Sequence, residues 1–252
     1  MPIETKENQI RAYYQALFQA WGTQNWWPAQ SRFEVIVGTF LTQNTSWTNV
    51  EKALVNLRKA RVLSVTGVRE TPLVDLEQLI RPAGYFRQKA QRLKIFVDFI
   101  DQQYKGSLKR LFARPTAKLR EELLSLNGIG PETADSILLY AGNHPVFVVD
   151  AYTRRILARH AIVPEEASYE AVRELVEQAL ASMADFPERI PTQDLPAPPH
   201  TPSRMSTAKR TALTQIYNEM HGLIVGVGKN YCRKSQPQCD GCPLQKFLTD
   251  IE

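Results

Sequence analysis

The spacing of apolar residues along the chain is the feature that most restricts its fold. Between residues 31 and 41, apolar side chains recur every three or four positions, as they do on the buried face of an α-helix. The same spacing returns over 87–104, 116–126, 131–142 and 213–227. No run of strand-like alternation between apolar and polar residues competes with it. The sequence therefore predicts an all-α protein.

The segment from residue 87 to residue 104 predicts an amphipathic helix with a basic start. Its apolar stripe is formed by Leu93, Phe96, Val97 and Ile100. We expect three basic residues of the segment to lie off that stripe, namely Lys89, Arg92 and Lys94. A proline-rich segment, residues 186–202, cannot continue a helix and is expected to form an extended loop.

Length and composition exclude several classes of protein. A chain of 252 residues can bury a sizeable core, and its three cysteines are too few for a disulfide scaffold. Neither a signal-peptide pattern nor the roughly 20 consecutive apolar residues of a membrane span is present. We expect a soluble, intracellular protein of the cytoplasm, a monomer without a membrane partner. Its net charge of +5 suits a polyanionic partner, although charge alone is weak evidence.

A tight turn between two expected helices carries the first functional signal. Asn127 and Gly128 are typical of a helix end, and Pro131 suits the first position of the next helix. Gly128 and Gly130 allow the backbone to lie close to another surface, and the free N–H groups of the following helix can bind a phosphate. Ile129 can pack between the two helices while the glycines face outward. Taken alone, such a segment is more often an ordinary helix–helix corner than a phosphate site.

An aspartate follows this turn by about twenty residues. Asp150 ends the apolar run 146–149 and stands at the start of the helical stretch 151–160. Aspartate is a favoured N-cap, which by itself explains the residue. The combination of a Gly-Ile-Gly hairpin and a Val-Asp pair at the next helix start nevertheless resembles the helix-hairpin-helix family of DNA glycosylases, which includes endonuclease III. In that family the aspartate is the catalytic carboxylate, so the resemblance implies that role for Asp150.

The resemblance also implies an architecture of two helical lobes. One lobe would contain residues 1–30 and 146–252, with a cysteine loop at 232–242. The other would contain residues 31–145 and end in the helix-hairpin-helix at 116–142. The residues of the hairpin that the resemblance assigns to DNA binding are Gly128, Ile129, Gly130 and Thr133.

Glu132 sets the expected reaction type. Family members that also cleave the DNA backbone carry a lysine just before the hairpin's Thr-Ala, where this chain has Glu132. A carboxylate cannot form a Schiff base, so the resemblance implies a monofunctional glycosylase in which Asp150 stabilises positive charge on the sugar and activates water. Glu132 itself is expected to favour the positive end of its helix. Two alternatives stay open: a lyase for oxidised or mismatched bases that uses another lysine, such as Lys229, and a DNA-binding module without catalysis.

Aromatic residues on either side of the first core helix suggest the base that leaves. Trp26-Trp27-Pro28 and the Leu41–Trp47 segment are similar to the 3-methyladenine DNA glycosylase III subgroup. The similarity implies that Trp26 and Trp47 sandwich an extruded alkylated purine, in a pocket that also includes Trp27, Pro28 and Glu132. A cationic base on an indole gains about 2 kcal/mol when desolvated. Trp47 follows Gln43 by four residues, so both can face one cleft if the helical turn continues.

Two side chains are expected to enter the DNA. Extruding a base from double-stranded DNA leaves a gap in the stack that the protein must fill. Gln43 matches the family's glutamine in the loop that enters this gap. Tyr85, in a segment that resembles the family's second inserting loop, is the other expected wedge. The expected partner is therefore double-stranded DNA that contains a damaged base.

The cysteines predict a metal site. Cys232, Cys239 and Cys242 form a C-x6-C-x2-C pattern similar to the family's [4Fe-4S] loop. The fourth cysteine would fall at Leu248, which cannot bind iron. We expect an iron–sulfur cluster whose fourth ligand is Asp250 or comes from outside the chain. A [3Fe-4S] form, a zinc ion and a site that has lost its metal are the alternatives.

Overall fold

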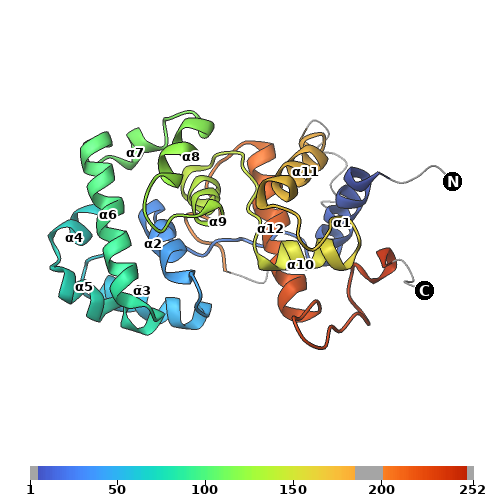
Figure 1. Ribbon diagram of the computed structural model, residues 1–252, viewed down its shortest axis with the longest axis horizontal. Helices are drawn as coiled ribbons and strands as arrows, with labels where there is room; N and C mark the ends of the chain where they lie inside the picture. Colours follow the sequence, from blue (N-terminus) through green and yellow to red (C-terminus); the bar gives the residue numbers. More distant parts are fainter. Residues whose placement is uncertain (1–4, 185–200, 249–252) are drawn as a thin grey trace. The chain divides into compact units, whose positions relative to one another are not determined.

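Every regular element that the structure describes is helical (Figure 1). The computed structural model describes residues 5–184 and 201–248, and within these ranges the all-α expectation is confirmed. The proline-rich segment expected at 186–202 lies mostly outside the described residues, and Asp250 lies outside them as well. No described helix is both long enough and apolar enough to cross a membrane.

The chain divides into two compact units. The central unit consists of residues 29–144, and the terminal unit consists of residues 1–28 together with 145–252. The elements of the central unit are α2 (Arg32–Thr42), α3 (Trp47–Lys59), α4 (Val65–Glu70), α5 (Leu73–Ile80), η1 (Arg81–Ala83), α6 (Phe86–Tyr104), α7 (Leu108–Leu111), α8 (Thr116–Leu124), α9 (Pro131–Ser136) and η2 (Ile137–Gly142). The elements of the terminal unit are α1 (Lys6–Trp21), α10 (Ala151–Arg159), α11 (Tyr169–Ala181), α12 (Ala212–Asn230) and η4 (Gln245–Phe247).

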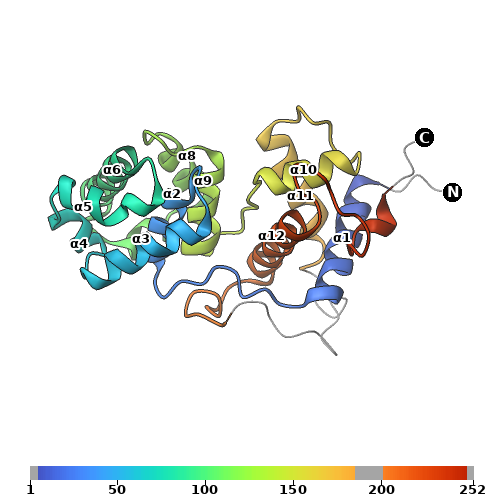
Figure 2. The ribbon, with the colours of Figure 1, turned by 90° about the horizontal axis from the view of Figure 1, so that it is seen from below.

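Helix α2 forms the core of the central unit. Residues 33–41 are all buried, and the helix packs against α3, α6, α9 and η2 (Figure 2). The Ser31 hydroxyl starts the helix by accepting a hydrogen bond from the Glu34 N–H at 3.1 Å. Glu34 is itself buried, and its carboxylate accepts hydrogen bonds from Arg58 and from the Gln30 N–H. The charge that α2 buries is therefore paired and hydrogen-bonded.

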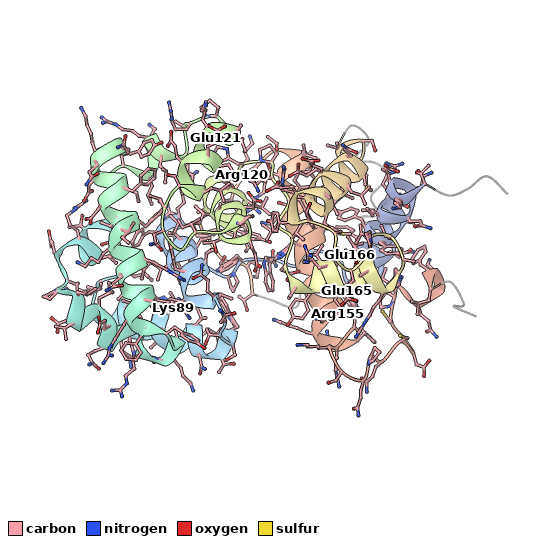
Figure 3. The ribbon with its side chains drawn as sticks, viewed as in Figure 1. Lys89, Arg120, Glu121, Arg155, Glu165 and Glu166 are labelled. Carbon is pink, nitrogen blue, oxygen red and sulfur yellow. The ribbon has the colours of Figure 1, made fainter. Side chains whose placement is uncertain are left out.

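Lys89 does not lie off the apolar stripe of α6, so that expectation is wrong. Its side chain is 1% exposed, and its ammonium donates to the Leu41 carbonyl at 2.8 Å and the Ala83 carbonyl at 2.9 Å (Figure 3). Burial lowers the pKa of Lys89 to about 8, and the positive charge of Arg92 contributes in the same direction. The position is four residues before Leu93 and therefore belongs to the stripe by helical spacing. The two acceptors are carbonyls that end α2 and η1, and they compensate the buried charge.

An ion pair joins the two helices of the hairpin. Arg120 on α8 donates to the two carboxylate oxygens of Asp135 on α9, at 2.7 and 3.1 Å (Figure 3). The Asp135 side chain is fully buried and the Arg120 side chain is 16% exposed. Beyond α9 the helix widens into a π-helical turn at η2 and ends at Gly142, the predicted end. The sequence pattern predicts the helix but not this change of hydrogen-bonding register.

Helix α12 forms the core of the terminal unit and packs against α1, α10 and α11. It begins at the cap residue Thr211 and ends at Asn230, two residues beyond the predicted end. Its close packing on α10 depends on Gly228, because a Cβ atom there would lie 2.1 Å from the Tyr152 ring. A larger residue at this position would separate the two helices.

We expect the Arg120→Met variant to lose about 3 kcal/mol of unfolding free energy, because the buried Asp135 carboxylate would lose its bidentate partner. Lys118→Met is the matched control on the same helix, since Lys118 pairs with Glu121 at the surface, and it is expected to cost less than about 0.5 kcal/mol. Urea unfolding of both variants measures the difference. Equal losses in the two variants would contradict the importance of the buried pair.

Candidate active site

Asp150 is held by the start of α10. Its backbone is extended, and its Oδ1 atom accepts hydrogen bonds from the Thr153 N–H at 2.7 Å and the Thr153 hydroxyl at 2.9 Å. This is the geometry of an N-cap, so the predicted position at a helix start is confirmed. The Asp150 side chain is 13% exposed. One carboxylate oxygen therefore serves the helix, while the second faces another element.

That second oxygen faces His221, a residue on α12 that sequence reasoning missed. The distance from His221 Nε2 to Asp150 Oδ2 is 3.6 Å. The imidazole is buried, and the rings of Phe147 and Trp26 are its neighbours at centroid distances of 6.4 and 6.3 Å. Burial lowers the pKa of His221, and the negative charge of Asp150 opposes this effect less strongly. The imidazole is therefore neutral near pH 7. The one sequence feature that points to His221 is its place as a single histidine among the apolar residues of α12.

Trp26 belongs to the same unit and is fixed through its backbone. Its carbonyl accepts a hydrogen bond from the Asn218 side-chain amide at 2.7 Å. The segment just before it is anchored as well, since the Gln24 N–H donates to the buried Glu219 carboxylate at 2.7 Å. Burial raises the pKa of Glu219. Polar side chains of α12 thus hold an irregular segment in place, which apolar periodicity could not predict.

The Trp26 indole has two ring neighbours and one cation beside it. The rings of His221 and Trp27 meet it at steep angles of 69° and 72°. The ammonium of Lys229, in the last turn of α12, lies over the indole at 5.5 Å from its centroid. The predicted pocket residue Trp27 is buried, and its carbonyl accepts a hydrogen bond from the Ser203 hydroxyl. Pro28 is half-buried.

In the central unit, the Gln43 amide is bonded to the hairpin. Its nitrogen donates to the Gly128 carbonyl at 3.2 Å and the Thr133 hydroxyl at 2.9 Å. Its oxygen accepts from Arg92 of α6 at 2.6 Å. Thr133 is buried. Gln43 therefore joins α6 to the hairpin, and it must break these bonds before it can enter DNA. No local sequence pattern predicts that Arg92 binds Gln43.

The hairpin glycines differ in their surroundings. Ile129 is buried between the helices as expected. Gly130 is exposed and a Cβ atom there would meet nothing within 4 Å. Gly128 does not face outward as expected: a Cβ atom there would lie 2.1 Å from Arg92, and its φ of +83° favours glycine.

Three further predicted residues lie at the surface or near it. Tyr85 is 67% exposed and caps the start of α6 with a φ of +46°. Glu132 is exposed in the first turn of α9, as expected for a residue that favours the positive end of a helix. Trp47 begins α3 and donates to Glu51 at 2.9 Å. Because α2 ends at Thr42, the helical turn does not continue from Gln43 to Trp47, and the argument from their spacing is wrong.

Comparison with known proteins identifies the family. The profile of the "HhH-GPD superfamily base excision DNA repair protein" family matches residues 37–182. The chain belongs to this superfamily. A putative DNA repair glycosylase of Methanocaldococcus jannaschii is 41% identical over 246 residues, which is 97% of each chain. The predicted family membership is confirmed, and DNA repair follows from it.

Other relatives place the fold among HhH-GPD proteins. Endonuclease III of Thermotoga maritima is 32% identical over 63% of this chain and 74% of its own length. The structure of the H. pylori 3-methyladenine DNA glycosylase bound to 1,N6-ethenoadenine has a TM-score of 0.70 and 27% identity, over 89% of this chain and 97% of that one. A non-covalent endonuclease III–DNA complex, at 21% identity, has a TM-score of 0.68, which supports the fold alone.

The cysteine loop of this HhH-GPD protein does not fit a four-ligand cluster. Leu248 occupies the fourth position, and no three His, Cys, Asp or Glu side chains among the described residues are grouped as metal ligands. Cys239 is exposed, and burial raises the pKa of the Cys242 thiol. The third thiol, of Cys232, instead accepts a hydrogen bond from Arg159 at 3.4 Å.

Arginines of α10 hold the loop in place. Arg155, which is labelled in Figure 3, donates to the Cys232 carbonyl at 2.7 Å. Arg159 donates to the carbonyls of Arg233 and Lys234 at 2.7 and 2.9 Å. Each guanidinium satisfies backbone acceptors that would otherwise need other partners. The helix that begins at Asp150 therefore also anchors the cysteine loop.

We expect Gly128→Ala to lower the free energy of unfolding by about 2 kcal/mol, because its left-handed backbone conformation alone costs an L-residue about 1–2 kcal/mol and the new methyl group would displace Arg92. Gly130→Ala is the matched control within the same hairpin. Its φ of −91° and open surroundings predict a change within about 0.5 kcal/mol. Chemical denaturation compares the two, and equal stabilities would contradict both the backbone cost and the displacement of Arg92.

Proposed function

We propose that the protein is a monofunctional DNA glycosylase that extrudes an alkylated purine, such as 3-methyladenine, from double-stranded DNA and hydrolyses its N-glycosidic bond. The observation that supports this most directly is the carboxylate of Asp150. Thr153 fixes one of its oxygens, the neutral His221 faces the other, and the aromatic ring of Trp26 lies next to His221. Little exposed and held rigidly, such a carboxylate is suited to stabilise positive charge.

In the proposed reaction, the bond between the sugar C1′ and the purine nitrogen breaks and the base leaves with the electron pair. The negative charge of Asp150 stabilises the positive charge that develops on the deoxyribose. A water molecule then adds to C1′ and gives its proton to the Asp150 carboxylate, from which it passes to solvent. No covalent bond to the protein forms, so the products are a free base and an intact strand with an abasic site.

An alkylated purine is proposed because of Trp26. The Trp26 indole neighbours His221, which in turn faces Asp150, and it provides a stacking surface. Alkylated purines stack on such rings and leave readily when charged. The name and ligand of the H. pylori relative, a 3-methyladenine DNA glycosylase bound to 1,N6-ethenoadenine, support the same class of base. The further assignments of Trp27, Pro28 and Glu132 to the pocket, and of Trp47 as the second ring, stay predictions from the resemblance.

The central unit is proposed to bind the DNA backbone and fill the gap left by the base. The exposed N-terminus of α9 offers backbone N–H groups to a phosphate next to Gly130. Tyr85 is the better supported wedge, because its ring is exposed and its backbone is fixed at the start of α6. Insertion of Gln43 requires release of its bonds to the hairpin.

A lyase that acts on oxidised or mismatched bases is the second candidate. Lys229 supports it, since this exposed amine lies over the Trp26 ring. Glu132 counts against it. In the helix-hairpin-helix glycosylases that also cleave DNA, the resemblance places a lysine at this position, whereas the present hairpin has a carboxylate. The cysteine loop is held by Arg155 and Arg159. We propose that it has a structural role and takes no part in the reaction.

We expect Asp150→Asn to reduce single-turnover release of 3-methyladenine from methylated DNA by at least about a thousandfold, because the charge that stabilises the transition state is lost. Asparagine is also a good N-cap, so the fold and DNA affinity should be retained. Thr153→Val is the matched control, which loosens the carboxylate without removing its charge and should cost far less. An unchanged rate in Asp150→Asn would refute the proposal.

A further inference from the structure

Lys229 places a positive charge against the ring that is proposed to stack on the base. Its ammonium lies 5.5 Å from the centroid of the Trp26 indole, within the range in which a cation is attracted to an aromatic face. The residue is in the last turn of α12, and its side chain is exposed. Its substitution should therefore leave the core of the terminal unit intact.

The Trp26 ring cannot easily move away from this charge. Asn218 holds its backbone carbonyl, and a Cβ atom at Gly222 would lie 3.1 Å from the Trp26 Cβ atom, so α12 packs closely on the base of the side chain. The rings of His221 and Trp27 meet the indole at steep angles. A base that stacks in parallel on the indole would therefore share the ring with Lys229.

We propose that Lys229 is a specificity-determining residue, whose ammonium repels a cationic base on the Trp26 ring and so reduces the preference of this ring for cationic over neutral alkylated purines. This inference rests on the proposed function, because Trp26 must contact the extruded base.

The distances determine the size of this repulsion. A base stacked about 3.5–4 Å from the indole places its charge roughly 9 Å from an ammonium on the other face, and closer to one on the same face. At an effective dielectric constant between about 20 and 80, repulsion between two unit charges at this separation weakens binding by roughly twofold to twentyfold. A neutral base does not experience this repulsion. Removal of the ammonium should therefore favour cationic substrates selectively.

A charge series at residue 229 tests the proposal. Single-turnover release of 7-methylguanine, a cationic base, and 1,N6-ethenoadenine, a neutral one, is measured from duplexes of the same sequence. Relative to the neutral base, Lys229→Met should raise the rate for the cationic base roughly twofold to twentyfold. Lys229→Glu should raise it further, and Lys229→Arg should match the original protein. Melting temperatures of all variants should agree.

Other outcomes would overturn the inference. Equal rates for the cationic base across the series would show that the charge does not reach the bound base. A similar loss for both substrates in Lys229→Met and Lys229→Glu would mean that Lys229 binds DNA phosphate instead. Asp150→Asn, assayed in parallel, separates this failure from that of the proposed function: if it still releases base, the catalytic assignment fails, whatever the series at residue 229 shows.

Discussion

The capping of α10 by Asp150 is the interaction on which the proposed chemistry depends. The same carboxylate starts a helix through Thr153 and offers a second oxygen beside His221. An N-cap is fixed by the backbone that it caps, so the oxygen proposed to act in catalysis is positioned before any substrate arrives. Because Arg155 and Arg159 of α10 also hold the cysteine loop, one short helix links the candidate carboxylate to the C-terminal tail.

Helix α6 has a comparable organising role in the central unit. Lys89 binds the carbonyl groups that end α2 and η1, just before the segments that carry Gln43 and Tyr85. Arg92, one turn later, reaches Gln43 and lies against Gly128 of the hairpin. The segments expected to meet DNA are thus held by two cations on one helix. Charged groups in these positions fix loops that have few apolar side chains of their own.

The sequence predicts the parts of this structure that follow from local rules. Apolar periodicity predicts the helices, and cap chemistry places Asp150 at a helix start. Lys89 shows that helical spacing can place a charged residue on the apolar stripe, where its charge alone would predict the surface. His221, Asn218 and Arg92 act through partners far away in the chain, and no local pattern specifies such partners. The break between Gln43 and Trp47 shows that a spacing argument holds only while the helix continues.

The most direct test of the account follows the products of the wild-type protein on methylated duplex DNA. Released bases are separated by chromatography, and the strands are analysed under denaturing conditions with and without chemical cleavage at abasic sites. Hydrolysis without a covalent intermediate predicts free 3-methyladenine or another alkylated purine, with strands that break only after that chemical treatment. Strand breaks that appear together with the released base would contradict hydrolysis without a covalent intermediate. DNA binding without base release would contradict the proposed glycosylase activity itself.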